Sequence, residues 1–110
     1  MIRIRDNIKG GALTETTFLI LLALYSPCHG YGIMQFIKDS TGGRVELGAG
    51  TQYGALNTLL EKGWIASAEG EQNYRKREYV ITALGKSKVE EEKKRLKEIL
   101  ELASRITETG

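Results

Sequence analysis

Residues 50–65, GTQYGALNTLLEKGWI, decide the fold of this 110-residue chain. Leu56, Leu59, Leu60 and Gly63 recur at helical spacing, so the segment is predicted to be a helix that buries one face. Gly63 is the residue that ends such a helix in the left-handed conformation, and an extended segment is predicted to follow it. The opposite face of the helix is predicted to be small and polar, and it consists of Thr51, Gln52, Ala55, Thr58 and Lys62.

This polar face indicates a helix that enters the major groove of DNA. Short side chains permit close approach, and the amide of Gln52 is able to pair with both hydrogen-bonding atoms of an adenine edge. Tyr53 and Asn57 suit phosphate oxygens, through the phenol and the amide. Taken alone, the periodicity also fits an ordinary amphipathic helix of a small α+β domain, and Tyr53 could then face the core. The DNA contacts predicted on this helix are Thr51, Gln52, Tyr53, Ala55, Asn57 and Thr58.

A β-hairpin is predicted after this helix. Its strands are residues 64–68 and 78–81, and a polar loop joins them. Arg75, Lys76 and Arg77 form a consecutive run of cations in this region. Such a run is often only a solvated turn, but beside a recognition helix it predicts a wing that contacts phosphates.

Two further helices are predicted upstream. Thr14 is a suitable N-cap for a helix that continues to about Tyr25, and its almost entirely apolar middle predicts burial on two sides. A second helix is predicted from Gly30 to about Ser40, with a short extended piece at residues 45–47 before the recognition helix.

A long C-terminal helix is predicted from the Thr82 cap to about Thr107. Its apolar residues follow a seam close to a heptad repeat, in which Glu92 occupies one position. One thin apolar stripe rarely stabilises an isolated helix, so the pattern predicts packing against a second copy of the chain. The predicted dimerisation residues are Phe18, Leu22, Val89, Leu96, Ile99, Ala103 and Ile106.

Together these elements predict a mostly α-helical fold with a small β-hairpin. The predicted organisation is an N-terminal arm at residues 1–13, a winged helix-turn-helix DNA-binding domain at residues 14–82, and a C-terminal dimerisation helix at residues 83–110. With 41% hydrophobic residues, the chain has enough apolar material for one such domain and one extra element.

Composition excludes several other classes of protein. The net charge of +2 neither requires nor forbids a nucleic-acid partner. The first eleven residues lack the pattern of a secretory signal, and the apolar run at residues 18–24 is far shorter than the roughly 20 residues that span a bilayer. We therefore expect no membrane association and a cytoplasmic protein, in which the single cysteine, Cys28, remains reduced.

No enzymatic motif is present in the sequence. A P-loop, a dinucleotide-binding glycine turn and a nucleophile elbow are all missing, so we expect no catalytic residues and no cofactor. Cys28 and His29 are the only cysteine and histidine, too few for a structural metal site. A redox role for Cys28 would require a lowered thiol pKa, and His29 is expected to bond near the start of the second helix.

Four segments, in order, resemble the PadR family of bacterial transcriptional regulators, especially its short members with one C-terminal helix. They are LTETTFLILLAL at residues 13–24, HGYGI at 29–33, GTQYGALNTLLEKGWI at 50–65 and KREYVITALGK at 76–86. The resemblance implies a dimeric winged-helix repressor whose C-terminal helix crosses to the partner subunit. It also implies DNA contacts by Tyr53 and its neighbours, with Lys76 and Arg77 serving the wing.

The chain departs from the family pattern at Glu78, where a second aromatic residue is common, and at Gly32, where a larger or charged residue is common. Some relatives sense aromatic compounds beside the C-terminal helices, so a small-molecule effector is a further expected partner, although residues 83–110 contain no aromatic residue. The hypothesis is a homodimeric repressor that binds a double-stranded DNA operator with an inverted repeat. The alternatives are a ligand-gated multidrug or phenolic sensor of the same fold and a winged-helix protein-interaction module without DNA binding.

Overall fold

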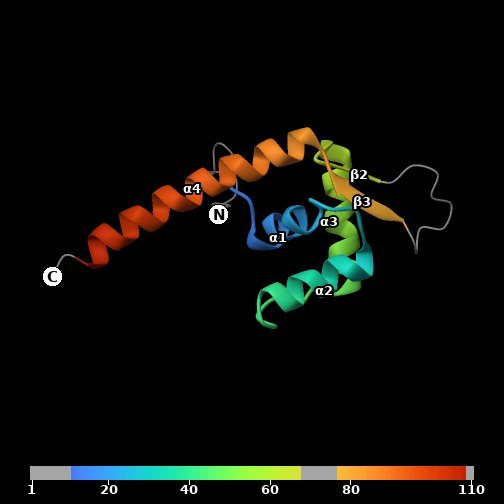
Figure 1. The fold of residues 1–110 in the computed structure, drawn as a ribbon, viewed down its shortest axis with the longest axis horizontal. Coiled ribbons are helices and arrows are strands. Elements are labelled where there is room, and N and C mark those ends of the chain that lie inside the picture. The colour runs from blue at the N-terminus through green and yellow to red at the C-terminus, as the bar shows by residue number, and fades with distance from the viewer. Residues whose placement is uncertain (1–10, 68–76, 109–110) are drawn as a thin grey trace, which may run out of the picture.

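The computed structural model describes residues 11–67 and 77–108, which form a small body with one long helix extending from it (Figure 1). The longest dimension of the molecule is 58 Å. The wing cations Arg75 and Lys76 lie outside the described residues. The elements of the described part are α1 (Glu15–Ala23), β1 (Cys28–His29), α2 (Gly30–Ser40), α3 (Ala49–Lys62), β2 (Ile65–Ser67), β3 (Glu78–Ile81) and α4 (Ala83–Thr107).

The first helix begins and ends close to the predicted positions. The Thr14 hydroxyl accepts a hydrogen bond from the Thr17 backbone N–H at 3.1 Å, which confirms the predicted N-cap. The helix ends at Ala23 rather than near Tyr25. Its residues Ile20 and Leu21 are completely buried, so this helix lies at the centre of the core.

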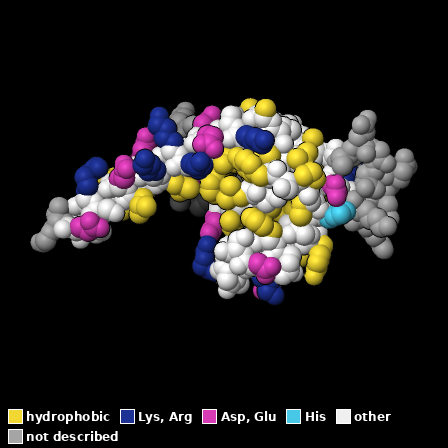
Figure 2. All heavy atoms as spheres, viewed as in Figure 1, with side chains coloured by type: hydrophobic (Ala, Val, Ile, Leu, Met, Phe, Trp, Pro, Cys, Tyr) yellow, Lys and Arg dark blue, Asp and Glu magenta, His cyan; other side chains and the backbone are white. Residues whose placement is uncertain are grey.

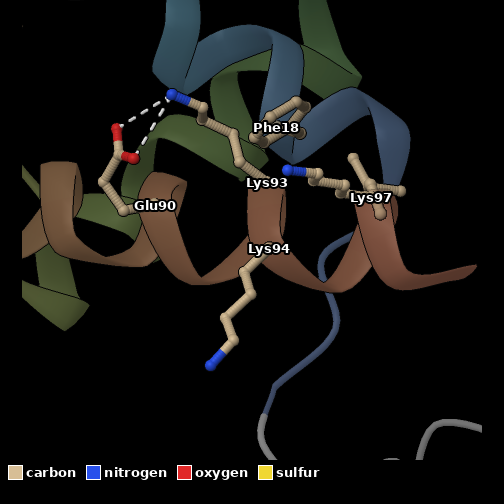
Figure 3. A pocket seen from close by; sticks show the side chains of 6 residues that line it. Phe18, Glu90, Lys93, Lys94 and Lys97 are labelled. Carbon is tan, nitrogen blue, oxygen red and sulfur yellow. Dashed lines mark hydrogen bonds and ion pairs between the residues drawn. The ribbon is translucent and has the colours of Figure 1, made fainter.

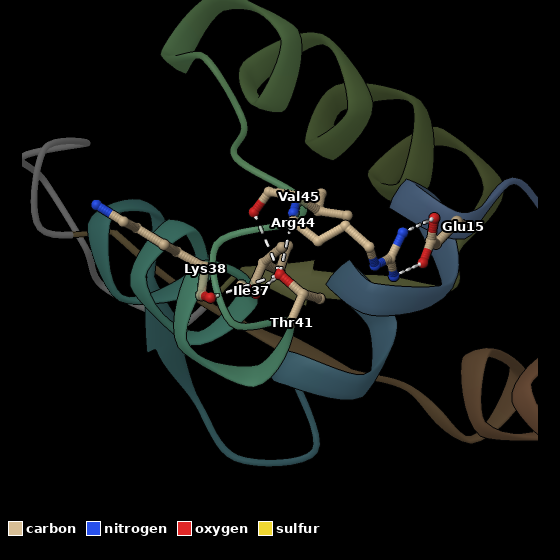
Figure 4. Close-up of polar contacts among 6 residues, drawn as sticks. All are labelled: Glu15, Ile37, Lys38, Thr41, Arg44 and Val45. Atoms are coloured by element: carbon tan, nitrogen blue, oxygen red, sulfur yellow. Dashed lines mark hydrogen bonds and ion pairs between the residues drawn. The ribbon is translucent and has the colours of Figure 1, made fainter.

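Thr41 organises the turn that separates α2 from α3 (Figure 4). Its hydroxyl donates to the carbonyl of Ile37 at 2.8 Å and accepts from the backbone N–H of Val45 at 3.1 Å. Arg44, in the same turn, forms a bidentate ion pair with Glu15 at the start of α1. Residues 45–47 form no strand, and Val45 is hydrogen-bonded to Thr41 rather than to a neighbouring strand.

The helix α3 ends as the sequence predicts. Gly63 adopts a φ of 75°, which is left-handed, and the N–H of Trp64 reaches back to the carbonyl of Leu59 at 3.1 Å. This geometry satisfies carbonyls that would otherwise be unpaired at the helix end.

The sheet has three strands rather than the two that the sequence predicts. β1 pairs with β3 in antiparallel fashion, and β3 pairs with β2, so that β3 is central. In this register Cys28 lies opposite Tyr79, and His29 lies opposite Glu78. A two-residue strand has no periodicity of its own, which is why the sequence pattern did not predict it.

Thr82 joins α3, the hairpin and α4. Its N–H donates to the carbonyl of Trp64 at 2.9 Å, and its hydroxyl donates to the carbonyl of Gly63 at 2.7 Å. The same hydroxyl accepts from the N–H of Gly85 at 3.1 Å, which confirms Thr82 as the N-cap of α4. The first turn of α4 is therefore fixed against the end of α3.

The apolar core lies where α1, α2, α3, the sheet and the first turns of α4 meet. Val89, one of the predicted dimerisation residues, is only 1% exposed and packs in this core. The largest completely or almost completely buried side chains are those of Ile20, Leu21, Leu24, Ile33, Ile37 and Val89.

Glu92 does not face outward along the helix seam. It is 4% exposed, and its Oε1 accepts from the N–H of Leu13 at 3.2 Å and from Nε of Arg95 at 3.0 Å. The hydrogen bond from Arg95 is the main reason that the pKa of Glu92 is lowered, against the effect of burial, which raises it. This carboxylate thereby ties the segment before α1 to α4.

Within the described ranges, no helix is both long and apolar enough to cross a membrane.

A substitution at Gly85 tests the close packing of α4 on the hairpin. A Cβ at this position would lie 2.2 Å from the carbonyl oxygen of Trp64, so Gly85→Ala should lower the free energy of unfolding by about 1–3 kcal/mol. Gly54→Ala is the matched control, because a Cβ there meets nothing within 4 Å and alanine favours a helix by about 1 kcal/mol. Urea denaturation at one fixed protein concentration should show opposite signs for the two variants. Equal effects would show that the close approach does not constrain the fold.

Glu92→Gln tests the buried carboxylate. Because the folded-state pKa of Glu92 lies below the ordinary value of 4.5, its contribution is present above that value and is lost as the pH falls through the folded-state pKa. The variant should be less stable than the wild type by about 1–2 kcal/mol at pH 7, and the difference should shrink below pH 4.5. Glu91→Gln, at an exposed site on the same helix, should change little at either pH. A difference at Glu92 that is independent of pH would contradict this role.

Candidate nucleic-acid interface

Four of the DNA contacts predicted on α3 are exposed. They are Thr51, Tyr53, Asn57 and Thr58, and Tyr53 is 55% exposed. Tyr53 therefore does not belong to the core, although it stands three residues before Leu56. Tyr53 and Asn57, four residues apart, share one side of the helix, where a phenol and an amide are able to bind phosphates or base edges.

Ala55 and Thr58 lie, with Thr51, on a different side of α3 from Tyr53 and Asn57. Ala55 and Thr58 line a cavity of about 600 Å³ together with Lys62, Trp64 and the residues that precede α1. Ala55 is half-buried against the core, and the Thr58 hydroxyl donates to the Gly54 carbonyl within the same helix at 3.2 Å. The described surface thus separates these two residues from Tyr53 and Asn57.

Gln52 is not on the polar face, contrary to the prediction. Only 4% of the residue is exposed, and its Nε2 donates to the Gly30 carbonyl at 2.8 Å. The amide that was expected to pair with adenine is therefore used inside the protein, where it links α3 to the first residue of α2. Its helical position lies between those of Leu56 and Leu59, which places it on the buried face.

Tyr31 was missed by the sequence analysis. It is 75% exposed in the first turn of α2 and lines the same cavity as Tyr53. An exposed aromatic beside the recognition helix extends the candidate surface onto α2. The signal was present in the HGYGI segment, but its exposure depends on how α2 packs against α3.

The hairpin contributes Arg77 to the surface. Arg77 is half-buried immediately before β3, and it is the one cation of the predicted wing run that falls within the described residues.

Cys28 and His29 lie together on β1 at one edge of the sheet. Burial, with a smaller contribution from the charge of Glu78, raises the pKa of the Cys28 thiol, which disfavours the reactive thiolate. The sequence predicts that His29 bonds near the start of α2, but its side chain makes no cap hydrogen bond there. Instead, its Nε2 lies 3.8 Å from Oε2 of Glu78. The part of the chain that the structure describes holds no cluster of three or more metal-ligating side chains.

The second half of α4 presents an apolar side. No described residue after Glu92 is buried, although Leu96, Ile99, Leu100 and Leu102 are large and apolar. Figure 2 shows apolar side chains gathered where the long helix meets the body, with lysines and arginines along the helix.

Phe18 of α1 continues this apolar surface and lies against α4, with Lys93 and Lys97 on the same side and Lys94 directed away (Figure 3). With Leu96 these residues line an open cavity of about 590 Å³, at whose rim Lys93 pairs with Glu90 at 3.3 Å. Of the predicted dimerisation residues, Phe18 and Leu22 are half-buried, and Leu96, Ile99, Ala103 and Ile106 are exposed.

Three helices followed by an antiparallel hairpin and a long extending helix define a winged helix-turn-helix protein. The model of the PadR-like family of transcriptional regulators matches residues 18–91, so the chain belongs to that family. This assignment confirms the family resemblance seen in the sequence. Among curated proteins, none matches the chain.

Several solved structures share the fold. A PadR family regulator from Eggerthella lenta DSM 2243 is 21% identical, with a TM-score of 0.72 over 86% of this chain and 82% of its own. A PadR family regulator from Clostridium difficile R20291 is 26% identical, with a TM-score of 0.69 over 86% and 99% of the two chains. Bacillus subtilis PadR, solved in complex with operator DNA, is 20% identical, with a TM-score of 0.56 over 73% of this chain and 46% of its own.

Proposed function

We propose that this transcriptional regulator is a homodimeric repressor that binds an inverted-repeat DNA operator. The observation that supports DNA binding is the exposed pair of Tyr53 and Asn57, four residues apart, on a helix whose other side is anchored in the core. Bacillus subtilis PadR, a protein with the same fold, has been solved with operator DNA. The proposal assigns α3 to the major groove.

The contacts in this proposal have different tasks. Thr51 lies in the first turn of α3 and approaches base edges, whereas Tyr53 and Asn57 donate to phosphates. Arg77, with Arg75 and Lys76 of the wing, adds phosphate contacts. Because these contacts release counterions from the DNA, the affinity for DNA falls as the salt concentration rises. Ala55 and Thr58 remain secondary contacts, because they face the cavity next to the start of α1. Gln52 is not among the proposed DNA contacts, because it is buried.

The apolar side of α4 supports the proposed dimer. A helix of 25 residues is about 38 Å long, and only its first ten residues contain buried positions. Leu96, Ile99 and Ala103 are spaced along one side as in a helix-pairing seam. A second copy that covers this side would place two recognition helices about one turn of DNA apart, which suits an inverted repeat.

A ligand-gated regulator of the same architecture is the second candidate. It is favoured by an apolar cavity of about 520 Å³ between α1 and α4, whose lining includes Phe18, Leu22 and Leu96 beside the Glu92–Arg95 pair. A planar compound bound there would pack on Phe18 and alter the angle of α4, and so the spacing of the two DNA-binding halves.

Tyr53→Ala tests the DNA contact. The operator is first selected with the wild-type chain from genomic fragments at moderate salt, and it should contain an inverted repeat. Loss of a phenol bonded to a charged phosphate should then weaken binding to that duplex about tenfold or more. Tyr25→Ala, a matched tyrosine exposed at the end of α1, should leave affinity unchanged.

The DNA selection also separates the proposal from its rival. A wild-type chain that selects no sequence and loses all binding as salt rises would overturn the repressor and favour a protein-interaction module. Selection of an operator with no effect of Tyr53→Ala would move the DNA contact away from this part of α3.

Ile99→Glu tests the dimer. Ile99 is about half exposed in the protomer, so a charge there should not unfold the chain, but it should be costly inside an apolar seam. Sedimentation should show monomers at concentrations where the wild type is dimeric. Lys94→Glu, at a lysine directed away from Phe18 in Figure 3, should remain dimeric. A dimeric Ile99→Glu protein would place the interface elsewhere.

A further inference from the structure

The cavity of about 600 Å³ beside the second half of α3 has a lining that suits an apolar segment of chain. Its walls are the second half of α3, Trp64 and the residues from Gly11 to the first turn of α1. Among the described residues that line it, Lys62 is the only one with a charged side chain. The apolar lining consists of Ala12, Leu13, Ala55, Leu59 and Trp64.

Two large apolar residues of this lining are not covered by the rest of the described chain. Leu13 and Trp64 are both half-buried, packing on the core while also lining the cavity. Nζ of Lys62 lies 5.2 Å from the centre of the Trp64 ring, which places one cation beside the apolar surface. Such a surface is stabilised when another apolar group removes it from water.

The chain itself leads a segment to this cavity. Gly11, the first described residue, belongs to the lining, and its φ of 71° is a left-handed conformation that suits a change of chain direction. Along α3, Ala55 and Lys62 are about 10 Å apart, because a helix rises about 1.5 Å per residue. An extended segment rises about 3.3 Å per residue, so about four residues before the Gly10–Gly11 pair span this length.

The segment before these glycines alternates in character. The even positions carry Ile4, Asp6 and Ile8, and the odd positions carry Arg3, Arg5, Asn7 and Lys9. Successive side chains of an extended chain point to opposite sides, so the isoleucines and the acid share one side and the cations share the other. The even side matches the cavity twice, since isoleucines suit its apolar lining and the single acid suits its single cation.

We propose that residues 4–8 bind in this cavity of their own subunit as an extended segment. Ile4 and Ile8 face the apolar lining, and Asp6 pairs with Lys62. Arg3 and Arg5 then point away from the cavity beside α3, where they add cations to the candidate DNA surface. This last step depends on the proposed DNA binding, whereas the packing of the segment does not.

NMR of the full-length protein measures the packing directly, because Trp64 is the only tryptophan. Nuclear Overhauser effects should connect the methyl groups of Ile4 or Ile8 with the Trp64 ring. Mixing ¹³C-labelled and unlabelled protein identifies the subunit that supplies the segment, and these effects should arise within one subunit.

Fluorescence of Trp64 supplies the matched pair of variants. Ile4→Ser/Ile8→Ser should increase quenching of Trp64 by acrylamide and shift its emission to longer wavelength, because the ring becomes more exposed. Arg5→Ser/Lys9→Ser, with the same spacing on the other side of the segment, should leave both quantities unchanged.

A charge reversal tests the ion pair. Lys62→Glu should weaken the Overhauser effects from the segment to Trp64, and Lys62→Glu/Asp6→Lys should restore them. Lys88→Glu is the control, because Nζ of Lys88 also lies over the Trp64 ring, at 5.8 Å, but Lys88 does not line the cavity. Equal weakening by Lys62→Glu and Lys88→Glu, or no restoration by Asp6→Lys, would refute the pair.

Absence of Overhauser effects between the segment and Trp64 in the wild type would overturn the inference. Equal quenching in the two double variants, or effects that arise only between subunits, would also overturn it. The wild-type spectra keep the inference testable if a variant fails to fold.

Operator titrations at several salt concentrations test the added cations. Arg3→Ser/Arg5→Ser should reduce the slope of log affinity against log salt by about 2 per chain, since each phosphate contact contributes about 0.9. Lys94→Ser should leave the slope unchanged, and an unchanged slope in the arginine variant refutes only this step. Operator binding without the Overhauser effects refutes only the packing, and the effects without operator binding refute only the DNA-binding function.

Discussion

The hydrogen bonds of Thr82 are the constraint on which the geometry of this molecule depends. One residue holds the carbonyls of Gly63 and Trp64 and caps α4 through the N–H of Gly85. The end of α3 and the start of α4 are thereby fixed directly to each other, although 19 residues separate Gly63 from Thr82. Any change in the direction of α4 is transmitted to α3 through this junction, because packed cores deform little.

Features encoded by neighbouring residues could be predicted from the sequence. The Thr14 and Thr82 caps, the left-handed Gly63 and the bounds of α2, α3, β3 and α4 each depend on groups only a few positions apart. The family resemblance could be recognised from the sequence for the same reason, because each motif that carries it is a short continuous segment.

Features that depend on distant partners could not be predicted. β1 exists only because two residues pair with β3, about 50 positions away. Gln52 is buried because its acceptor, Gly30, lies 22 residues earlier, and Glu92 is held by Leu13 across 79 residues. A polar residue in a helical pattern is normally assigned to the solvent side. The exceptions here are side chains for which tertiary packing provides a partner, and Gln52 is the one that changes the candidate site.

The absence of buried positions after Glu92 in the described part of α4 has a consequence for its local stability. The distal segment contributes nothing to the core of its own subunit, so in an isolated protomer its helix–coil equilibrium depends on local sequence alone. Cooperative protection of its amide hydrogens from exchange would then have to come from another molecule. On the proposed dimer, order in this segment increases with cellular copy number, and occupancy of the operator becomes a sigmoidal rather than a hyperbolic function of expression level.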